Sequence, residues 1–246
     1  PIYINTHDDH ERIASLFKKY DLISMPVVDN ERRLVGIVTI DDVVDIIDQE
    51  NTEDFQKMAA MHPSDEEYLK TSPLTLARHR ITWLLILMIS ATLTGNIIIR
   101  FNDVLQSVVV LASFIPMLMD TGGNSGSQSS TLIIRGLALG EIKTSDIFKV
   151  IWKEIQVSSI VGLFLSLLNF VRIYFLKKID LNISLTVCIT LFLTVMLAKI
   201  IGGVLPILAK KLKLDPAIMA SPLITTIVDA AALTIYFSVA TWILHI

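Results

Sequence analysis

One acidic residue in an apolar part of the sequence is the strongest candidate for chemistry. Asp229 lies deep within residues 217–246, where most of its neighbours are apolar. A carboxylate at such a depth in a membrane costs roughly 2.5–3.5 kcal/mol, so we expect it to meet a cation, a partner or water. In a helix, Ser221 and Thr225 share a face with Asp229 at four-residue steps. These oxygens suit a hard cation that keeps its own water; the alternative is a protonated aspartate hydrogen-bonded to a neighbouring helix.

A polar, glycine-rich segment, residues 120–131, interrupts a second apolar stretch. Lipid would not tolerate this segment, because each unsatisfied polar group in hydrocarbon is costly. Its small residues Gly122, Gly126 and Ser130 have the spacing of closely packed membrane helices. Packing alone does not require the amide of Asn124. We therefore expect one face of this segment to line a pore, while another face can pack against a helix.

The composition indicates a membrane protein. The chain has 246 residues, of which 52% are hydrophobic and only 18% charged, and its mean hydropathy is +0.61. This balance is too apolar for an ordinary soluble domain of this size. A net charge of −3 gives no basic footprint for nucleic acid, and the single cysteine, Cys188, excludes a disulfide framework. The sequence begins at Pro1, and we expect it to be a fragment that lacks an N-terminal portion.

The elements that must position these residues are membrane helices. Five segments reach the length of about 20 apolar residues that a spanning helix needs. They are residues 81–101, 104–137, 150–176, 181–208 and 217–246. We therefore predict five transmembrane helices over residues 81–246, of which the second is overlong and has a polar centre. Loop lysines and arginines are more frequent on the side of residues 1–80, which favours a cytoplasmic soluble part and an external C-terminus.

Residues 1–50 have the pattern of a small α/β domain. We expect a helix over residues 8–20, strands over 25–28 and 34–39 and a helix over 41–50. This order, with Met-Pro-Val-Val-Asp at 25–29, resembles a cystathionine-β-synthase (CBS) domain. The resemblance implies a partner copy upstream, and it implies that Thr39 and Asp42 hold the ribose of ATP or another adenine nucleotide. The alternative is that Thr39 ends a strand while Asp42 favours the first turn of a helix.

Residues 51–80 form an acidic connector, which we predict to be a helix interrupted at Pro63 and Pro73. One interpretation is a solvated linker. The other is that its carboxylates, facing acidic groups of the soluble part, are bridged by hard cations. The residues concerned are Glu53, Asp54, Asp65 and Glu66.

Three motifs resemble the MgtE family of magnesium transporters. They are Thr-Gly-Gly-Asn at residues 121–124, Asp-Pro-Ala at 215–217, and Ser-Pro-Leu at 221–223 followed by Asp229. The resemblance covers the whole chain: a CBS domain, a connecting plug-like helix and five transmembrane helices. It implies a homodimer in the plasma membrane, with a pore on the two-fold axis lined by the second and fifth spans.

The resemblance also implies the ion path and its regulation. Paired Asp229 carboxylates would bind hydrated Mg²⁺, assisted by the Thr225 carbonyl and by polar groups around Asn124 and Thr131. Intracellular Mg²⁺ at the acidic connector would close the pore. Two positions depart from the family pattern: Ser127 and Ser221 stand where asparagine is expected, which gives a roomier or more water-mediated site.

The resulting expectation is a passive, inward Mg²⁺ channel and not an enzyme. No Walker motif for ATP hydrolysis is present. A transporter for cobalt, manganese or calcium is the first alternative. An intramembrane aspartyl protease that uses Asp120 and Asp229 is the second, although Asp229 lacks the expected Gly-x-Gly-Asp setting. Lys199, near one end of the fourth predicted span, either pairs with Asp120 or extends to the membrane interface.

Overall fold

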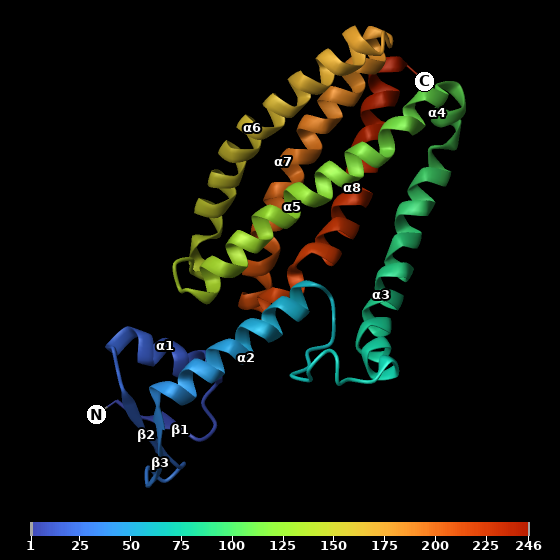
Figure 1. Ribbon diagram of the computed structural model, residues 1–246. Helices are drawn as coiled ribbons and strands as arrows, with labels where there is room; N and C mark the ends of the chain where they lie inside the picture. Colours follow the sequence, from blue (N-terminus) through green and yellow to red (C-terminus); the bar gives the residue numbers. More distant parts are fainter. Residues whose placement is uncertain (1, 246) are drawn as a thin grey trace. The chain divides into compact units, whose positions relative to one another are not determined.

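The computed structural model describes residues 2–245, apart from the side chain of Ser221. The chain divides into two compact units, shown in Figure 1. The first consists of residues 2–57 and 62–76, and the second of residues 58–61 and 77–245.

The first unit is a small α/β domain. It contains β1 (Ile4–Asn5), α1 (His10–Tyr20), β2 (Ser24–Val28), β3 (Leu34–Thr39) and most of α2 (Ile40–Met58). The sheet has the order β1-β2-β3, with β1 parallel and β3 antiparallel to β2. Helices and sheet enclose a core of five buried residues: Ile4, Ile13, Phe17, Met25 and Val43.

Local hydrogen bonds explain where these elements begin and end. Asp9 caps α1 by accepting a hydrogen bond from the backbone N–H of Glu11 at 3.4 Å. Asp29 turns the chain between β2 and β3, because its Oδ1 accepts the N–H groups of Glu31 and Arg33, each at 2.9 Å. The expected helix, strand, strand, helix order is therefore present, with boundaries shifted by at most two residues except at the end of the last helix.

The connector differs from the expected interrupted helix over residues 51–80. Helix α2 continues through position 50 to Met58 because no glycine or proline stops it there. Residues 59–72 contain no helix, and Ala60 has a positive φ of 53°. Pro63 lies in this break as expected. Pro73 instead begins α3, in the first turn, where a missing N–H costs little.

The second unit consists of long helices. They are α3 (Pro73–Arg100, whose first residues belong to the first unit), α4 (Asn102–Ser107), α5 (Ile115–Ala138), α6 (Ile147–Phe170), α7 (Leu181–Lys211) and α8 (Ser221–Leu244). Shorter turns are 3-10 helices at Val109–Phe114, Thr144–Asp146 and Pro216–Met219, and a π-helix at Val171–Leu176. Helix α7 packs against α5, α6 and α8, and α5 also packs against α8 (Figure 1).

Among the described residues, four helical segments are long and apolar enough to cross a membrane. They are Pro73–Arg100, Thr144–Leu176, Leu181–Lys211 and Pro216–Leu244. The second predicted span, over residues 104–137, is instead divided into α4, a 3-10 helix and α5. Helix α5 has 24 residues, a length of about 36 Å at 1.5 Å per residue. It is long enough to span, but its polar residues make it less apolar than the other four.

Small residues let α5 approach its neighbours closely. A Cβ on Gly202 of α7 would lie 2.1 Å from the carbonyl oxygen of Gly126, so the two backbones nearly touch. A Cβ on Gly122 would meet Thr194 at 2.7 Å and Val228 at 2.9 Å. The expectation that the small residues of segment 120–131 serve close packing is confirmed for these contacts.

Candidate functional site

Helices α5 and α8 pack antiparallel, and their contacts fix which residues lie at the same level. The position of a Cβ on Gly122 is 2.9 Å from Val228, and that on Gly126 is 2.6 Å from Ile224. Further along, the hydroxyl of Ser130 donates a hydrogen bond to the carbonyl oxygen of Met219 at 2.6 Å. Residue numbers therefore rise along α5 as they fall along α8.

Asp229 lies at the level of Asp120 in this register. The two carboxylates are near enough to interact electrostatically. Asp229 is half-buried on α8, and within the described part of the chain it accepts no hydrogen bond and forms no ion pair. Its charge is therefore not compensated by the side chains that the structure describes.

Asn124 lies one helical turn from Asp120 on α5. Its Nδ2 donates a hydrogen bond to Asp120 Oδ1 at 3.1 Å. This bond points the amide nitrogen of Asn124 at the carboxylate. The amide oxygen of Asn124 remains able to accept a hydrogen bond or to ligate a cation. Asp120 and Asn124 thus form an oxygen-rich pair on the exposed side of α5, at the level of Asp229 on α8.

The remaining predicted residues continue along both helices. The Thr225 methyl group packs against Gly123, because a Cβ built on Gly123 would lie 2.8 Å from this methyl group. The Thr225 hydroxyl donates a hydrogen bond to the Pro222 carbonyl at 3.0 Å. Ser127 donates to the carbonyl of Gly123 at 2.8 Å. Ser221 begins α8, and its side chain lies outside the described residues. Thr131 lies about 10 Å beyond Asn124 along α5, at 1.5 Å per residue.

Helix α5 has two opposite faces. Its glycine face is buried against α7 and α8, as the contacts of Gly122 and Gly126 show. The other face is exposed and carries a polar row at helical spacing. Its members are Asp120, Asn124, Gln128 and Thr131.

The oxygen set suits a hydrated hard cation better than a fully protein-ligated one. Carboxylate, amide and hydroxyl oxygens are the ligands that Mg²⁺ and similar ions take. Among residues 2–245, leaving aside the Ser221 side chain, no three His, Cys, Asp or Glu side chains come together as a metal site. One copy of the chain therefore supplies two carboxylates and several neutral oxygens at this level.

Two buried polar features were not predicted as part of a site. The Ser129 hydroxyl donates to Glu154 Oε2 at 2.7 Å, joining α5 to α6, and both residues are buried. Lys199 is buried on α7 with 5% of its surface exposed, and among the described residues it forms no ion pair with Asp120. The sequence pattern of α6 does not predict the contact of Glu154 with Ser129, because this contact depends on how the helices pack.

The acidic residues of the connector lie on both sides of the break after α2. Glu53 forms an ion pair with Lys57 on α2. Gln56 and Ser64 hold the chain after the break against α2 through hydrogen bonds of 2.9 and 2.6 Å. The predicted regulatory residues Glu53 and Asp54 belong to α2, and Asp65 and Glu66 follow Ser64 directly.

Glu50, near this connector, belongs to an acidic group of the first unit. Burial, together with the neighbouring carboxylates of Glu53, Glu11 and Asp9, raises the pKa of Glu50 above its usual value. A carboxylate with a raised pKa is held in a surrounding that disfavours its negative charge. His10 Nδ1 lies 3.6 Å from Glu50 Oε1 and acts against this shift, and a cation in this region would relieve the repulsion further.

Thr39 and Asp42 are brought together at the start of α2. The hydroxyl and the backbone N–H of Thr39 both donate to Asp42 Oδ2, at 2.6 and 2.9 Å. These bonds hold the pKa of Asp42 below its usual value. The pair therefore caps α2. This arrangement is close to the alternative in which Thr39 ends a strand and Asp42 favours the first turn of a helix. Asp42 remains exposed.

Two family models match the chain. Residues 115–239, which include both α5 and most of α8, match a family described as MgtE, a divalent cation transporter. Residues 1–49 match the CBS domain.

Three curated relatives are similar over nearly the whole chain, and each is named magnesium transporter MgtE. The protein from Thermus thermophilus is 41% identical over 99% of this chain and 54% of its own length. The Bacillus subtilis protein is 37% identical over 96% of this chain and 52% of its own. The Enterococcus faecalis protein is 30% identical over 97% and 52%. The chain thus spans about half the length of these relatives.

Proposed function

The chain belongs to the MgtE family of divalent cation transporters, and from this premise we propose that it forms the pore of a passive magnesium channel. Two copies would enclose a path for hydrated Mg²⁺ along their two-fold axis. Helices α5 and α8 of each copy would line this path, and α5 would be the fifth membrane span beside the four apolar ones.

The observation that carries this proposal is the exposed polar row of α5 beside Asp229. In a single copy, Asp120, Asn124 and Gln128 are exposed on a helix that packs against the membrane-length apolar segments of α7 and α8. Lipid against these groups would cost several kcal/mol for each unsatisfied polar atom. A second copy that faces the same row would remove it from lipid and enclose a polar path. The proposed homodimer follows from this cost.

Magnesium is proposed as the ion from the relatives' names and from the chemistry of the oxygen set. Mg²⁺ gives up its water reluctantly, and a site with few carboxylates can hold the ion with much of its hydration shell. Asp229 from both copies would supply the central charge. The residues proposed around that ion are Thr225, Ser221, Asn124, Ser127 and Thr131.

The proposed direction of transport is inward and needs no ATP hydrolysis. The membrane potential contributes about 2.3 kcal/mol per charge per 100 mV, hence about 4.6 kcal/mol for a divalent ion. The proposed orientation places residues 1–57 in the cytoplasm and the C-terminus outside, in the plasma membrane. Labelling of a cysteine introduced at position 245 by an impermeant reagent added outside intact cells checks this orientation, and protection of that cysteine would contradict it.

Regulation by cytoplasmic Mg²⁺ is proposed at the acidic connector. The repulsion that acts on Glu50, together with Glu53, Asp54, Asp65 and Glu66 around the Gln56–Ser64 contact, supports a cation there. If so, Mg²⁺ should protect residues 50–70 from proteolysis, and the combined change Glu53→Gln and Asp54→Asn should weaken this protection. Equal protection of the variant would contradict the proposal.

An adenine nucleotide is proposed at the CBS domain, where its ribose would compete with the hydrogen bond between Thr39 and Asp42. Titration calorimetry with ATP should show binding that Thr39→Ala weakens. The absence of heat with the full chain would remove the nucleotide from the account.

The transport proposal is tested by Mg²⁺ flux into proteoliposomes. Asp229→Asn, which removes the charge and keeps the shape, should reduce uptake at least tenfold. Asp103→Asn on α4 makes the same change at an exposed aspartate outside the proposed path and should leave uptake unchanged. Competition by calcium, manganese and cobalt would separate magnesium selectivity from broader transport. Uptake by Asp229→Asn at the level of the unsubstituted chain would overturn the proposal.

A further inference from the structure

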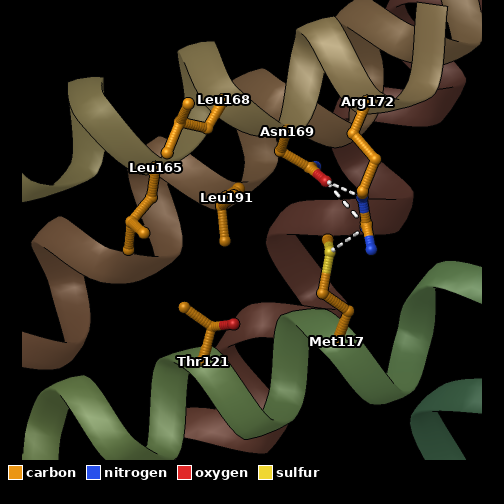
Figure 2. A pocket seen from close by; sticks show the side chains of 7 residues that line it. All are labelled: Met117, Thr121, Leu165, Leu168, Asn169, Arg172 and Leu191. Carbon is orange, nitrogen blue, oxygen red and sulfur yellow. Dashed lines mark hydrogen bonds between the residues drawn. The ribbon is translucent and has the colours of Figure 1, made fainter. Parts of the chain in front are cut away.

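A cavity of about 240 Å³ lies between α5, α6 and α7 (Figure 2). It lies at the end of the bundle where α5 begins and α6 turns toward α7 (Figure 1). The lining residues are Met117, Thr121, Leu165, Leu168, Asn169, Arg172 and Leu191. None of them belongs to the ion path proposed above.

Arg172 brings a positive charge to this cavity that no described carboxylate balances. Its Nε and one terminal nitrogen donate to Asn169 Oδ1, at 3.1 and 2.8 Å. The same terminal nitrogen also lies 3.1 Å from the sulfur of Met117, a weak acceptor. No acidic side chain of the described chain forms an ion pair with Arg172. The second terminal nitrogen is left for an anion.

Asn169 is the buried partner that fixes this guanidinium. Only 7% of its surface is exposed. Because its Oδ1 accepts two hydrogen bonds from Arg172, the guanidinium plane is held at the mouth of the cavity (Figure 2). An arginine held in this way presents its remaining donors in a fixed geometry, which suits phosphate oxygens.

The rest of the cavity is mostly apolar. Leu165, Leu168 and Leu191 form its walls in Figure 2, and Thr121 lies across the cavity from Arg172. The Thr121 hydroxyl makes no hydrogen bond to the described residues, unlike the Thr225 and Thr226 hydroxyls, which bond to a carbonyl of their own helix. A ligand with an anionic head group and an apolar body fits a cavity that has polar groups at Arg172 and Thr121 and apolar walls elsewhere.

We propose that this cavity binds the phosphate group of an anionic phospholipid. The phosphate oxygens would accept hydrogen bonds from Arg172, and the first acyl carbons would lie along Leu165 and Leu168. Arg172 lies in the last turn and a half of a membrane-length helical segment, Thr144–Leu176, the depth at which lipid phosphates are found. Basic pockets between membrane helices hold lipid headgroups by this means. A free phosphate ion offers the same oxygens, so the two sources must be separated.

Native mass spectrometry of the full chain, taken from nanodiscs of mixed phosphatidylglycerol and phosphatidylcholine, tests the proposal. We expect the unsubstituted chain to retain phosphatidylglycerol, and Arg172→Gln to retain at least fivefold less. Arg172→Lys should retain an intermediate amount, because lysine keeps the positive charge and lacks the planar set of N–H donors of arginine. The matched control is Lys178→Asn, which removes an exposed cation beyond the same helical segment, outside the cavity, at a position of positive φ that asparagine tolerates.

A second variant keeps Arg172 and fills the cavity. Leu168→Trp, at a half-exposed position, should also reduce retention of phosphatidylglycerol. This variant keeps the proposal testable if the Arg172 variants do not fold. In a parallel arm, inorganic phosphate is added to protein in phosphatidylcholine alone. A rise in melting temperature with phosphate that Arg172→Gln abolishes, without lipid retention, would keep the phosphate site and assign it to the free ion.

Two results would overturn the proposal. One is equal retention of phosphatidylglycerol by the unsubstituted chain and by both Arg172→Gln and Leu168→Trp, with no effect of phosphate. The other is an equal loss of lipid in Lys178→Asn and Arg172→Gln, which would mean that the membrane responds to net charge and not to this cavity. Neither result depends on ion transport, so the test stands apart from the proposed channel function.

Discussion

At the residue scale, Asp42 shows how one carboxylate stabilises the start of a helix. It accepts two hydrogen bonds from Thr39, the residue before α2, at 2.6 and 2.9 Å. Its exposure means that water screens the charge, so hydrogen bonds provide most of its effect.

The lowered pKa of Asp42 predicts a pH dependence of stability. A carboxylate whose pKa is lower in the folded chain stabilises the fold above its unfolded pKa, about 3.9. This stabilisation is lost as pH falls through the lower folded value. Hydrogen exchange of residues 39–45, corrected for the intrinsic rates, should therefore be faster in Asp42→Ala than in the unsubstituted chain at pH 7, with the difference closing near pH 2.

The matched control for Asp42 is Asp41→Ala, because Asp41 lies in the same first turn and makes no side-chain hydrogen bond to the described residues. It should change the exchange of residues 39–45 less. A difference between Asp42→Ala and the unsubstituted chain that stays constant from pH 7 to pH 2 would contradict the assigned hydrogen bonds.

The sequence singles out most of the candidate site residues, but it does not show which residues of other helices lie beside them. Asp229 and Asn124 stand out because polar groups in apolar segments are costly. The common level of Asp120 and Asp229 depends on the antiparallel register of α5 and α8, and a residue pattern within one helix carries no information about that register. The same applies to the bond between Ser129 and Glu154.

At the element scale, the crossing of α5 and α7 is the tightest feature of the second unit. A Cβ at Gly202 would lie 2.1 Å from the Gly126 carbonyl oxygen, a backbone atom that cannot rotate away. Gly202→Ala should therefore force the helices apart and destabilise the chain by about 1–3 kcal/mol or more. Thermal unfolding in detergent, followed by size-exclusion chromatography, measures this loss.

Gly95→Ala on α3 is the control for that substitution, since no atom lies within 4 Å of its Cβ position. Alanine favours a helix by about 1 kcal/mol over glycine, so this variant should be as stable as the unsubstituted chain or slightly more stable. A Gly202→Ala protein that unfolds at the same temperature as Gly95→Ala would contradict the close crossing.

Helix periodicity and composition located most elements, and their ends were harder to predict. The helix of residues 8–20 and the strands of the first unit were placed within about two residues because caps and turns mark them. Helix α2 runs past its expected end because nothing stops it before Ala60. The start of α5 at Ile115 was missed because residues 104–114 are as apolar as a span and yet form shorter helical pieces.

At the scale of the whole molecule, the exposed polar row of α5 predicts where two copies meet. In a Cys188→Ala background, Asn124→Cys should give a covalent dimer with a short methanethiosulfonate cross-linker in membranes. Ile160→Cys is the control, because Ile160 is 73% exposed on α6, and that face is proposed to lie against lipid. Denaturing electrophoresis reads the result. Efficient cross-linking at position 160 with none at 124 would place the interface elsewhere.

The two-part organisation of the chain was readable from the change in charge after residue 80, and the family was readable from three motifs. The number of spans was harder to read from the sequence. A pore-lining helix needs polar residues, and these lower the hydropathy by which spans are recognised, as α5 shows.

The central claim is that paired Asp229 side chains hold the transported ion on a two-fold axis. Anomalous diffraction from crystals soaked in manganese, which replaces magnesium and scatters anomalously, tests this claim most directly. The account predicts a peak on the axis between the two Asp229 carboxylates, and no peak there in Asp229→Asn crystals grown in the same way. A peak that persists in Asp229→Asn, or manganese bound only at the acidic connector of the unsubstituted chain, would contradict it.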